Sequence, residues 1–173
     1  MQPFIVAIPV FDAAMAVKAY RLCERSSSKL LDSVEDFRDT TDALSAPGLE
    51  LVAAVGTEPF AGDSPLLVSL NAYQLMMGMP LNMSIDPHKL VCVLPGALKL
   101  DRTLLHRCAS LRAAGCALGL QGFEEPMLEG ELIRFCQYIV LDYADPSLQK
   151  KLRFITRRIP DKVLVIDGVP NHQ

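Results

Sequence analysis

The stretch Gly-Cys-Ala-Leu-Gly-Leu-Gln-Gly-Phe at residues 115–123 decides the fold of this chain. Its centre, residues 116–120, is apolar, short and uncharged, as expected for a strand buried on both faces of a parallel sheet. In barrels and doubly wound sheets, chemistry normally takes place at the carboxyl ends of such strands. Here that end carries Gln121 and Gly122, and neither residue can serve as an acid, a base or a strong metal ligand.

An amphipathic helix is predicted directly before this strand, over residues 101–114. Leu104, Leu105, Cys108 and Leu111 recur at helical spacing and form its inner face. Asp101 is a suitable N-cap, and Gly115 is suited to the position just past the helix end. The segment therefore reads as a helix followed by a buried strand.

This alternation of strands and helices continues from residue 87 to the end of the chain. Apolar runs predict strands at residues 90–94, 138–141 and 163–166. One helix is predicted at residues 126–135. A second helix is predicted to begin with Asp145 as its N-cap and Pro146 as its first position. One face of this second helix is formed by Leu148, Leu152, Ile155 and Ile159. Such alternation predicts a parallel α/β sheet.

The first half of the chain is less regular. Residues 4–10 predict a strand, and the residues after it fit either a returning strand at 17–23 or a helix at 13–23. A further helix is expected to end at Pro47-Gly48, with an inner face made of Leu31, Val34, Phe37, Thr41 and Leu44. Strands are expected at residues 49–55 and 66–70, and the Met-rich run at 74–79 is interpreted as core filler.

Composition and charge narrow the class of protein. The chain has 173 residues, enough for one domain with a real core, and is 50% hydrophobic and 21% charged, which is typical of a globular protein. A net charge of −3 without a basic stripe argues against nucleic-acid binding. Arg153, Arg157 and Arg158 do cluster, but they read most simply as the solvated face of a helix.

The sequence indicates a cytoplasmic protein that does not enter the membrane. No apolar run reaches the ~18 residues of a membrane helix, and no signal peptide is visible. The five cysteines are scattered and mostly lie in apolar stretches, which suits reduced, buried thiols. Three histidines and no Cys-x-x-Cys motif make a zinc site unexpected, and we expect no resident cofactor or metal ion.

Seven short segments, each on a predicted strand, resemble one known family. Residues 9–12 (Pro-Val-Phe-Asp) and 20–23 (Tyr-Arg-Leu-Cys) are similar to its Pro-Ile-Phe-Asp and Tyr-Glu-Leu-Leu motifs. Residues 68–71 and 89–93 are similar to the strands that deliver its metal-binding Asn and Glu. Residues 115–123, 138–142 and 165–169 are similar to segments that read Asp-Asp-Phe, Tyr-Ile-Lys-Ile-Asp and Val-Ala-Glu-Gly-Val. The chain thus resembles the EAL domain, the bacterial cyclic-di-GMP phosphodiesterase module, and most of all the branch followed by an HDOD domain.

The resemblance implies a modified TIM-type (β/α) barrel with an N-terminal β-hairpin, formed as a single domain over residues 1–173. It therefore favours the hairpin over the helix for residues 13–23. TIM barrels take at least ~200 residues, so we expect an incomplete or truncated barrel, the N-terminal part of a longer protein. An open sheet edge predicts a homodimer or another protein partner, with an interface that includes the terminal strand, the 145–159 helix or the hairpin.

The departures from the family pattern imply lost catalysis. Arg21 replaces the signature Glu, and the other degenerate positions are Val93 for a metal-binding Glu, Gln121 and Gly122 for the two aspartates, and Val140 for the catalytic Lys. The surviving ligand-binding positions are Arg25, a phosphate contact in the family, together with Asn71, Asp142 and Asp167. Arg21 is expected to pair with Asp142 or Asp167, because an unpaired buried charge is very costly.

We therefore expect a non-catalytic signal-transduction or interaction domain. Two alternatives stay open: a cyclic-di-GMP phosphodiesterase with rearranged ligands, and a receptor that binds cyclic-di-GMP without cleaving it. Asn71, Asp142 and Asp167 also have a simpler interpretation, in which each hydrogen-bonds the turn after its strand.

Overall fold

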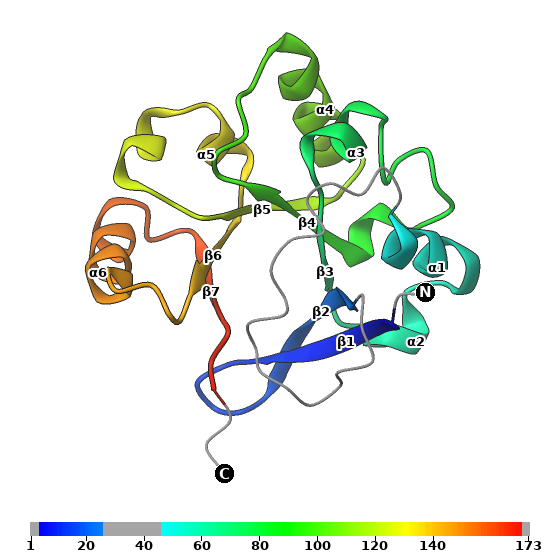
Figure 1. The fold of residues 1–173 in the computed structure, drawn as a ribbon, viewed down its shortest axis with the longest axis horizontal. Coiled ribbons are helices and arrows are strands. Elements are labelled where there is room, and N and C mark those ends of the chain that lie inside the picture. Colours follow the sequence, from blue (N-terminus) through cyan, green and yellow to red (C-terminus); the bar gives the residue numbers. More distant parts are fainter. Residues whose placement is uncertain (1–3, 26–45, 171–173) are drawn as a thin grey trace.

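The computed structural model describes residues 4–25 and 46–170, and seven strands in this part of the chain form one curled sheet with helices along its outer side (Figure 1). The order of strands in the sheet is their order in the sequence. The strands are β1 Phe4–Phe11, β2 Val17–Arg25, β3 Leu66–Ser69, β4 Leu90–Pro95, β5 Ala117–Gln121, β6 Tyr138–Asp142 and β7 Val163–Asp167. The helices are α1 Pro47–Val55, α2 Glu58–Ala61, α3 Ala72–Met76, η2 Pro87–Lys89, α4 Arg102–Ala113, η3 Glu125–Glu129, α5 Leu132–Phe135 and α6 Leu148–Arg158.

The N-terminal segment is a β-hairpin, as the resemblance implies, and the alternative helix over residues 13–23 is wrong. β1 runs antiparallel to β2, with Ile8 opposite Arg21. The Asp12 carboxylate fixes the turn between them, because its Oδ1 accepts hydrogen bonds from the backbone N–H groups of Ala14 and Ala16, each at 2.9 Å. Every later pair of neighbouring strands is parallel. The fold is an α/β half-barrel, as predicted.

Alternating side chains give the sheet two different faces. In β4, Cys92 and Leu94 point outward into the main core, where they pack with Leu111 of α4 and the other buried residues of the helix layer. Val91 and Val93, between them in sequence, belong to a separate apolar cluster on the inner, concave face. Both faces are buried in β4, which explains why its sequence is a continuous apolar run.

Helix α4 and strand β5 match their prediction closely. The Asp101 carboxylate caps α4 by accepting a hydrogen bond from the Leu104 N–H at 2.8 Å. Gly115 follows the helix with a φ of +100°, and a Cβ there would lie 2.3 Å from the His88 ring. Glycine is therefore required at this position both by the backbone and by the packing. β5 begins at Ala117 rather than at residue 116, so Gln121 is its last residue.

The predicted strand at residues 49–55 is wrong, because this segment is helix α1. Pro47 begins that helix instead of ending an earlier one, as proline can at a first helical position. Leu49 and Val52, three residues apart, are buried on one side, while Leu51 and Val55 are exposed. The run is apolar enough for a buried strand, but only one face of it is covered.

Three other predictions need correction. The helix expected at residues 126–135 is divided at Gly130 into η3 and α5. Helix α6 begins at Leu148 after Ser147 as N-cap, so Asp145-Pro146 lies in the turn before the helix. The interpretation of the Met-rich run as core filler fails for Met76 and Met77, which are 48% and 52% exposed.

The helix predicted around Leu31–Leu44 lies outside the described residues. Within those residues β7 pairs with β6 alone, so β7 is an edge strand of the curled sheet. Val163 and Ile166 on this edge are 48% and 39% exposed.

None of the helices in residues 4–25 and 46–170 combines the length and the apolar character needed to cross a membrane.

Candidate functional site

Polar side chains gather at one edge of the sheet, where the parallel strands end. Gln121, Asp142 and Asp167 are the last residues of β5, β6 and β7, and Asn71 lies two residues past β3. Asp142 and Asp167 stand directly opposite each other in the β6–β7 register. The four residues therefore lie at the same end of the half-barrel, as the sequence predicts.

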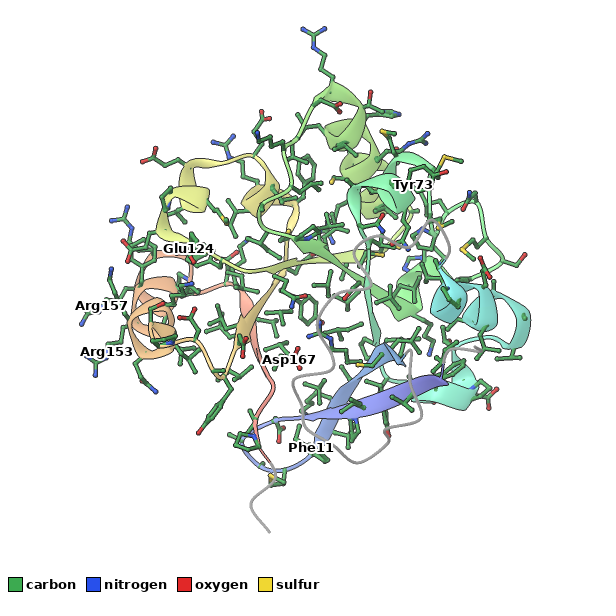
Figure 2. All side chains as sticks on the ribbon, in the orientation of Figure 1. Phe11, Tyr73, Glu124, Arg153, Arg157 and Asp167 are labelled. Atoms are coloured by element: carbon green, nitrogen blue, oxygen red, sulfur yellow. The ribbon has the colours of Figure 1, made fainter. Side chains whose placement is uncertain are left out.

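Arg21 of β2 reaches across the concave side of the sheet into this group. Its Nη1 donates to Asp167 Oδ2 at 2.5 Å, and its Nη2 donates to Gln121 Oε1 at 3.2 Å. The Arg21 side chain is only 13% exposed, whereas the Asp167 side chain is 41% exposed. Figure 2 shows Asp167 between β7 and the N-terminal hairpin. The prediction that Arg21 pairs with a surviving carboxylate is confirmed, and Asp167 is that carboxylate.

The pairing also explains how the sheet is held in its curled shape. β7 lies at one end of the strand order and β2 is the second strand from the other end, so four other strands separate them. A side-chain contact between them requires the sheet to curl far enough for its ends to approach across the concave face. The ion pair thus spans the mouth of the half-barrel.

The remaining polar residues at this edge hydrogen-bond the turns that follow their strands. Asn71 Oδ1 accepts from the Gln74 N–H at 2.8 Å, and Gln74 Oε1 accepts from the Asn71 N–H at 3.0 Å, forming a capping box at the start of α3. Asp142 Oδ1 accepts from the Ala144 N–H at 2.8 Å, and Asp167 Oδ1 accepts from the Gly168 N–H at 3.0 Å. The turn-stabilising interpretation of these side chains is confirmed.

Arg25 is the last residue of β2, which runs parallel to β3, so its backbone lies at the same edge as Asn71. The structure describes that backbone position but not the Arg25 side chain. The expected phosphate contact of Arg25 therefore stays a prediction.

Two of the degenerate positions have become part of an apolar interior. Val93 and Val140 are 2% and 1% exposed and belong to the concave cluster with Leu67 and Val165. A third degenerate position, Gly122, is exposed and turns the chain after β5 with a φ of +75°. The sites where the family resemblance puts a carboxylate and a lysine thus hold close-packed methyl groups.

The donors present do not fit a divalent cation. Mg²⁺ prefers an octahedral shell of oxygens with carboxylates among them. At this edge Asn71 offers a neutral oxygen that already caps a helix, and one oxygen of Asp167 is held by the Arg21 guanidinium. Among the described residues, no group of three or more His, Cys, Asp or Glu side chains is arranged to hold a metal ion.

Two of the buried thiols, Cys108 and Cys136, are unsuited to nucleophilic chemistry. Four cysteines, Cys92, Cys108, Cys116 and Cys136, are buried and form no disulfide. Burial raises the pKa of the Cys108 thiol to about 11 and that of Cys136 to about 12. These two thiols therefore remain protonated at neutral pH, as expected of structural cysteines.

A second polar cluster, which was not predicted from the sequence, lies in the outer layer of the protein. Lys151 of α6 is only 7% exposed and donates to Glu124 Oε1 at 2.6 Å, while its Nζ lies 2.8 Å from Asp145 Oδ2. Burial works to lower the pKa of Lys151, but the hydrogen bonds to Asp145 and Glu124 outweigh it and raise that pKa. A signal was present, since Lys151 lies between Leu148 and Ile155 at the spacing of the buried helix face.

Comparisons with known proteins bear on the fold. No protein-family model matches the sequence, and no curated protein matches it either. Solved structures do match. The chain is similar to Klebsiella pneumoniae BlrP1 in a manganese and cyclic-di-GMP complex, with 18% identity and a TM-score of 0.68 over 99% of this chain and 50% of BlrP1.

Two further solved structures give the same picture. Vibrio cholerae LapD, an S helix-GGDEF-EAL structure bound to cyclic-di-GMP, has 14% identity and a TM-score of 0.68 over 98% of this chain and 48% of LapD. An EAL domain protein from Listeria monocytogenes has 13% identity and a TM-score of 0.66, over 98% of this chain and 79% of that protein. The chain spans about half the length of BlrP1 and LapD. Its half-barrel has the fold seen in EAL domain proteins.

Proposed function

We propose that this chain is a non-catalytic signalling or interaction domain with the EAL fold, which has lost cyclic-di-GMP phosphodiesterase activity. The observation that carries this proposal is the Arg21 guanidinium, which bonds Asp167 and Gln121 at the mouth of the half-barrel. The family resemblance puts a metal-binding carboxylate at the position of Arg21. A permanent cation therefore takes the place of a metal ligand.

Simple electrostatics supports the loss of metal-dependent hydrolysis. Two like charges about 4 Å apart repel by roughly 4 kcal/mol per charge product at an effective dielectric constant near 20. A divalent cation beside the Arg21 guanidinium would meet this repulsion, and it would compete with Arg21 for Asp167. Two-metal catalysis also needs bridging carboxylates, which Gln121 and Gly122 do not supply.

The proposal is tested by incubating the purified protein with cyclic-di-GMP and Mg²⁺ or Mn²⁺ and following product by chromatography. We expect no turnover above a blank without protein. Turnover that is abolished by Asp167→Ala would contradict the proposal and favour a phosphodiesterase with rearranged ligands. Turnover that Asp167→Ala leaves unchanged would indicate a contaminating enzyme.

Arg21→Glu gives a sharper test of the same idea, because it restores a carboxylate next to Asp167. We expect millimolar Mn²⁺ to raise the melting temperature of Arg21→Glu and to leave that of the wild-type protein unchanged. A matched control is Arg102→Glu, which makes the same charge change at an exposed position of α4. Equal stabilisation of all three proteins would contradict the proposed role of Arg21.

A receptor that binds cyclic-di-GMP without cleaving it is the second candidate. It is supported by the common edge that carries the backbone of Arg25 together with Asn71, Asp142 and Asp167, and by the solved LapD structure of the same fold, which is bound to cyclic-di-GMP. Isothermal titration of the protein with cyclic-di-GMP separates the two candidates. Binding that is weakened by Arg25→Ala, without hydrolysis, would favour the receptor.

For the partner we propose a second copy of this chain, which pairs along the exposed edge of the sheet. In the described part of the chain β7 has a neighbour on one side only, and exposed apolar residues lie on β7 and on the hairpin, among them Val163, Ile166, Phe11 and Val17. Proteins rarely leave such an edge uncovered. Light scattering on the purified chain should give the mass of a dimer, and Ile166→Lys should shift it toward the monomer. A wild-type monomer at high concentration would contradict this proposal.

A further inference from the structure

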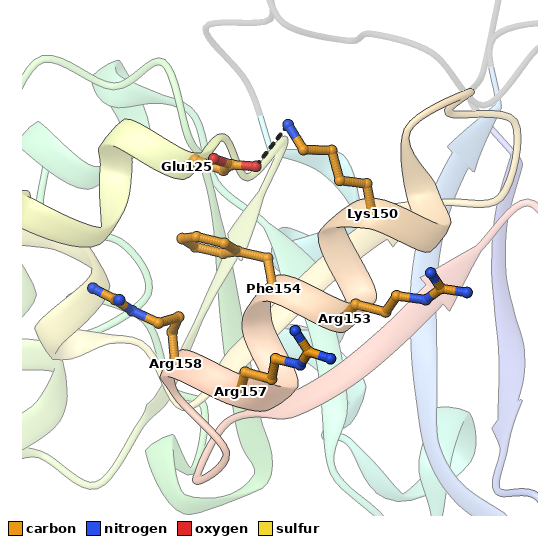
Figure 3. Close-up of a pocket in the computed structure, with 6 residues that line it drawn as sticks. All are labelled: Glu125, Lys150, Arg153, Phe154, Arg157 and Arg158. Carbon is orange, nitrogen blue, oxygen red and sulfur yellow. Dashed lines mark ion pairs between the residues drawn. The ribbon is translucent and has the colours of Figure 1, made fainter.

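A hollow of about 480 Å³ lies on the outer side of α6, far from the mouth of the half-barrel. Figure 3 shows its lining, which is Glu125 from η3 together with Lys150, Arg153, Phe154, Arg157 and Arg158 from α6. One aromatic ring, four cations and one carboxylate thus line the hollow. The sequence analysis interpreted the three arginines simply as a solvated helix face.

Helical spacing explains why these side chains share one face. Lys150, Arg153 and Arg157 follow one another at intervals of three and four residues, and Phe154 and Arg158 form the adjoining row. The buried residues of the same helix, Leu148, Lys151 and Ile155, lie on another side and contact the core. The cationic face is therefore available while α6 stays anchored to the protein.

Phe154 gives the hollow a fixed apolar floor. Its ring lies 6.3 Å from that of Phe123, centroid to centroid, at an interplanar angle of 37°. Phe123 is completely buried, and Phe154 is partly buried against the main core. Because one side of the Phe154 ring is packed, its other side is held in place without the need for a partner.

The charge around this floor is unbalanced. Lys150 pairs with Glu125 at 2.9 Å, but within the described residues the guanidinium groups of Arg153, Arg157 and Arg158 make no ion pair or hydrogen bond. All three arginines are exposed. They gather on one helix of a chain whose net charge is −3. A ligand for this face should therefore carry negative charge.

We propose that this hollow is a docking site for an acidic segment of a partner protein, in which an apolar side chain is flanked by carboxylates. The apolar side chain enters the hollow and packs on Phe154, while the carboxylates bond the guanidinium groups of Arg153, Arg157 and Arg158. The planar guanidinium of arginine binds carboxylates bidentately, which lysine cannot do. The volume of the hollow suits one or two side chains.

The geometry favours a peptide over other polyanions. The cations from Lys150 to Arg158 span about 12 Å of helix at ~1.5 Å per residue, which is short for a track of nucleic-acid phosphates. A membrane surface would contact the arginines on the rim but would not place a side chain against Phe154. The site also shares no residue with the Arg21 cluster, so its test is independent of the proposed function.

The experiment measures binding of a short fluorescein-labelled peptide in which one Phe lies between two pairs of Glu. The protein is the full chain at low salt, and the readout is fluorescence anisotropy. We expect saturable binding that weakens as salt is raised, because exposed charges are screened. Replacing Arg153 and Arg157 by Glu together should reduce affinity about tenfold or more, since each exposed ion pair contributes up to about a factor of five.

Two controls make the test decisive. Lys99→Glu with Arg102→Glu makes the same total charge change at exposed residues outside the hollow, and it should reduce affinity less than the Arg153 and Arg157 pair. A peptide with Ser in place of Phe tests whether the apolar side chain packs on Phe154. This comparison uses the wild-type protein, so it does not depend on the folding of any variant. We expect that peptide to bind more weakly than the Phe peptide.

Several results would overturn the proposal. They are the absence of saturable binding by the wild-type chain, equal affinity for the Phe and Ser peptides, and equal loss in the two double variants. Tighter binding of a labelled oligo-dT or of phosphatidylserine vesicles than of the peptide would overturn it as well, and would assign the basic face to another class of partner.

Discussion

The cations of Arg21 and Lys151 are largely withdrawn from water, one on each side of the sheet. On the concave side the Arg21 side chain is 13% exposed and bonds one carboxylate, Asp167, and one amide, Gln121. In the outer layer the Lys151 side chain is 9% exposed and bonds two carboxylates, Glu124 and Asp145. Both satisfy the rule that a buried charge must be compensated, but they do so with different partners.

The difference lies in what each cation connects. Lys151 ties α6 to two segments that follow β5 and β6, so all its partners are close neighbours in the outer layer. Arg21 instead joins β2 to β7 across the open side of the sheet, and Asp167 remains 41% exposed. Lys151 therefore acts as a clamp, which here means that it fixes helix α6 to the segments packed against it. Arg21 instead lies at the mouth of the half-barrel, where the family resemblance implies a metal-binding carboxylate. The two should respond differently to mutation.

Removing Lys151 should have the largest effect. Lys151→Ala leaves Glu124 and Asp145 facing each other without a cation and removes a buried aliphatic stem, so we expect unfolding free energy to fall by about 2–3 kcal/mol. Urea denaturation measures this change. Lys150→Ala, at the exposed neighbouring residue, is the matched control and should cost no more than about 0.5 kcal/mol. Equal costs for the two variants would remove the distinction between clamp and surface pair.

Separating Arg21 from Asp167 should have a smaller effect. A double-mutant cycle of Arg21→Ala and Asp167→Ala should give a coupling energy of about 1 kcal/mol, because the pair is only half withdrawn from water. The pair of Lys89 and Asp63, at 3.2 Å, has a fully exposed carboxylate and is the control, and its coupling should be close to zero. A coupling as large as the cost of Lys151→Ala would mean that the mouth is as rigidly held as the outer layer.

The smallest effect concerns pH. Hydrogen bonds from Lys151 and then from Ser147 lower the pKa of Asp145 to about 2. A carboxyl with a lowered pKa contributes stability that is fully present above its unfolded pKa of ~3.9 and is lost as pH falls through the folded value. The melting temperature of wild type should therefore exceed that of Asp145→Asn above about pH 5, and the difference should shrink between pH 4 and 2.

Asp63→Asn, a change of the same charge at a fully exposed residue, controls for the effect of net charge on melting. If the difference between wild type and Asp145→Asn stayed constant from pH 7 to pH 2, the contact with Lys151 would not be the source of the lowered pKa. That outcome would also weaken the interpretation of Lys151 as a clamp.

Local patterns in the sequence predicted much of the fold. Strands β4, β6 and β7 are short apolar runs bounded by turn residues, and α4 has a cap at Asp101 and a glycine at 115, so each carries its own signals. Residues 49–55 carry an apolar run of the same kind, yet they form helix α1. Whether such an apolar run forms a strand or a helix depends on which of its faces the rest of the protein covers.

For the candidate site, the sequence predicted where its residues lie but not which of them pair. Parallel strands end at one edge, so the common location of Gln121, Asp142 and Asp167 follows from their place in the sequence. The choice of Asp167 rather than Asp142 as the partner of Arg21 does not follow, because it depends on how tightly the sheet curls. The Lys151 cluster joins three segments, and their contacts are determined by tertiary packing. The sequence signal for this cluster was the position of Lys151 on an apolar helix face.

The strand order has a consequence for how the protein is made. Each strand after β1 adds next to the strand synthesised before it, so no strand must wait for a partner from a distant part of the chain. On a ribosome, which delivers the chain from its N-terminus, the sheet can grow one strand at a time in the order of translation. The contact between Arg21 and Asp167 joins an early strand to the last one, and it forms when β7 has emerged. The contact between Arg21 and Asp167 can therefore form only when the last strand of the sheet is present.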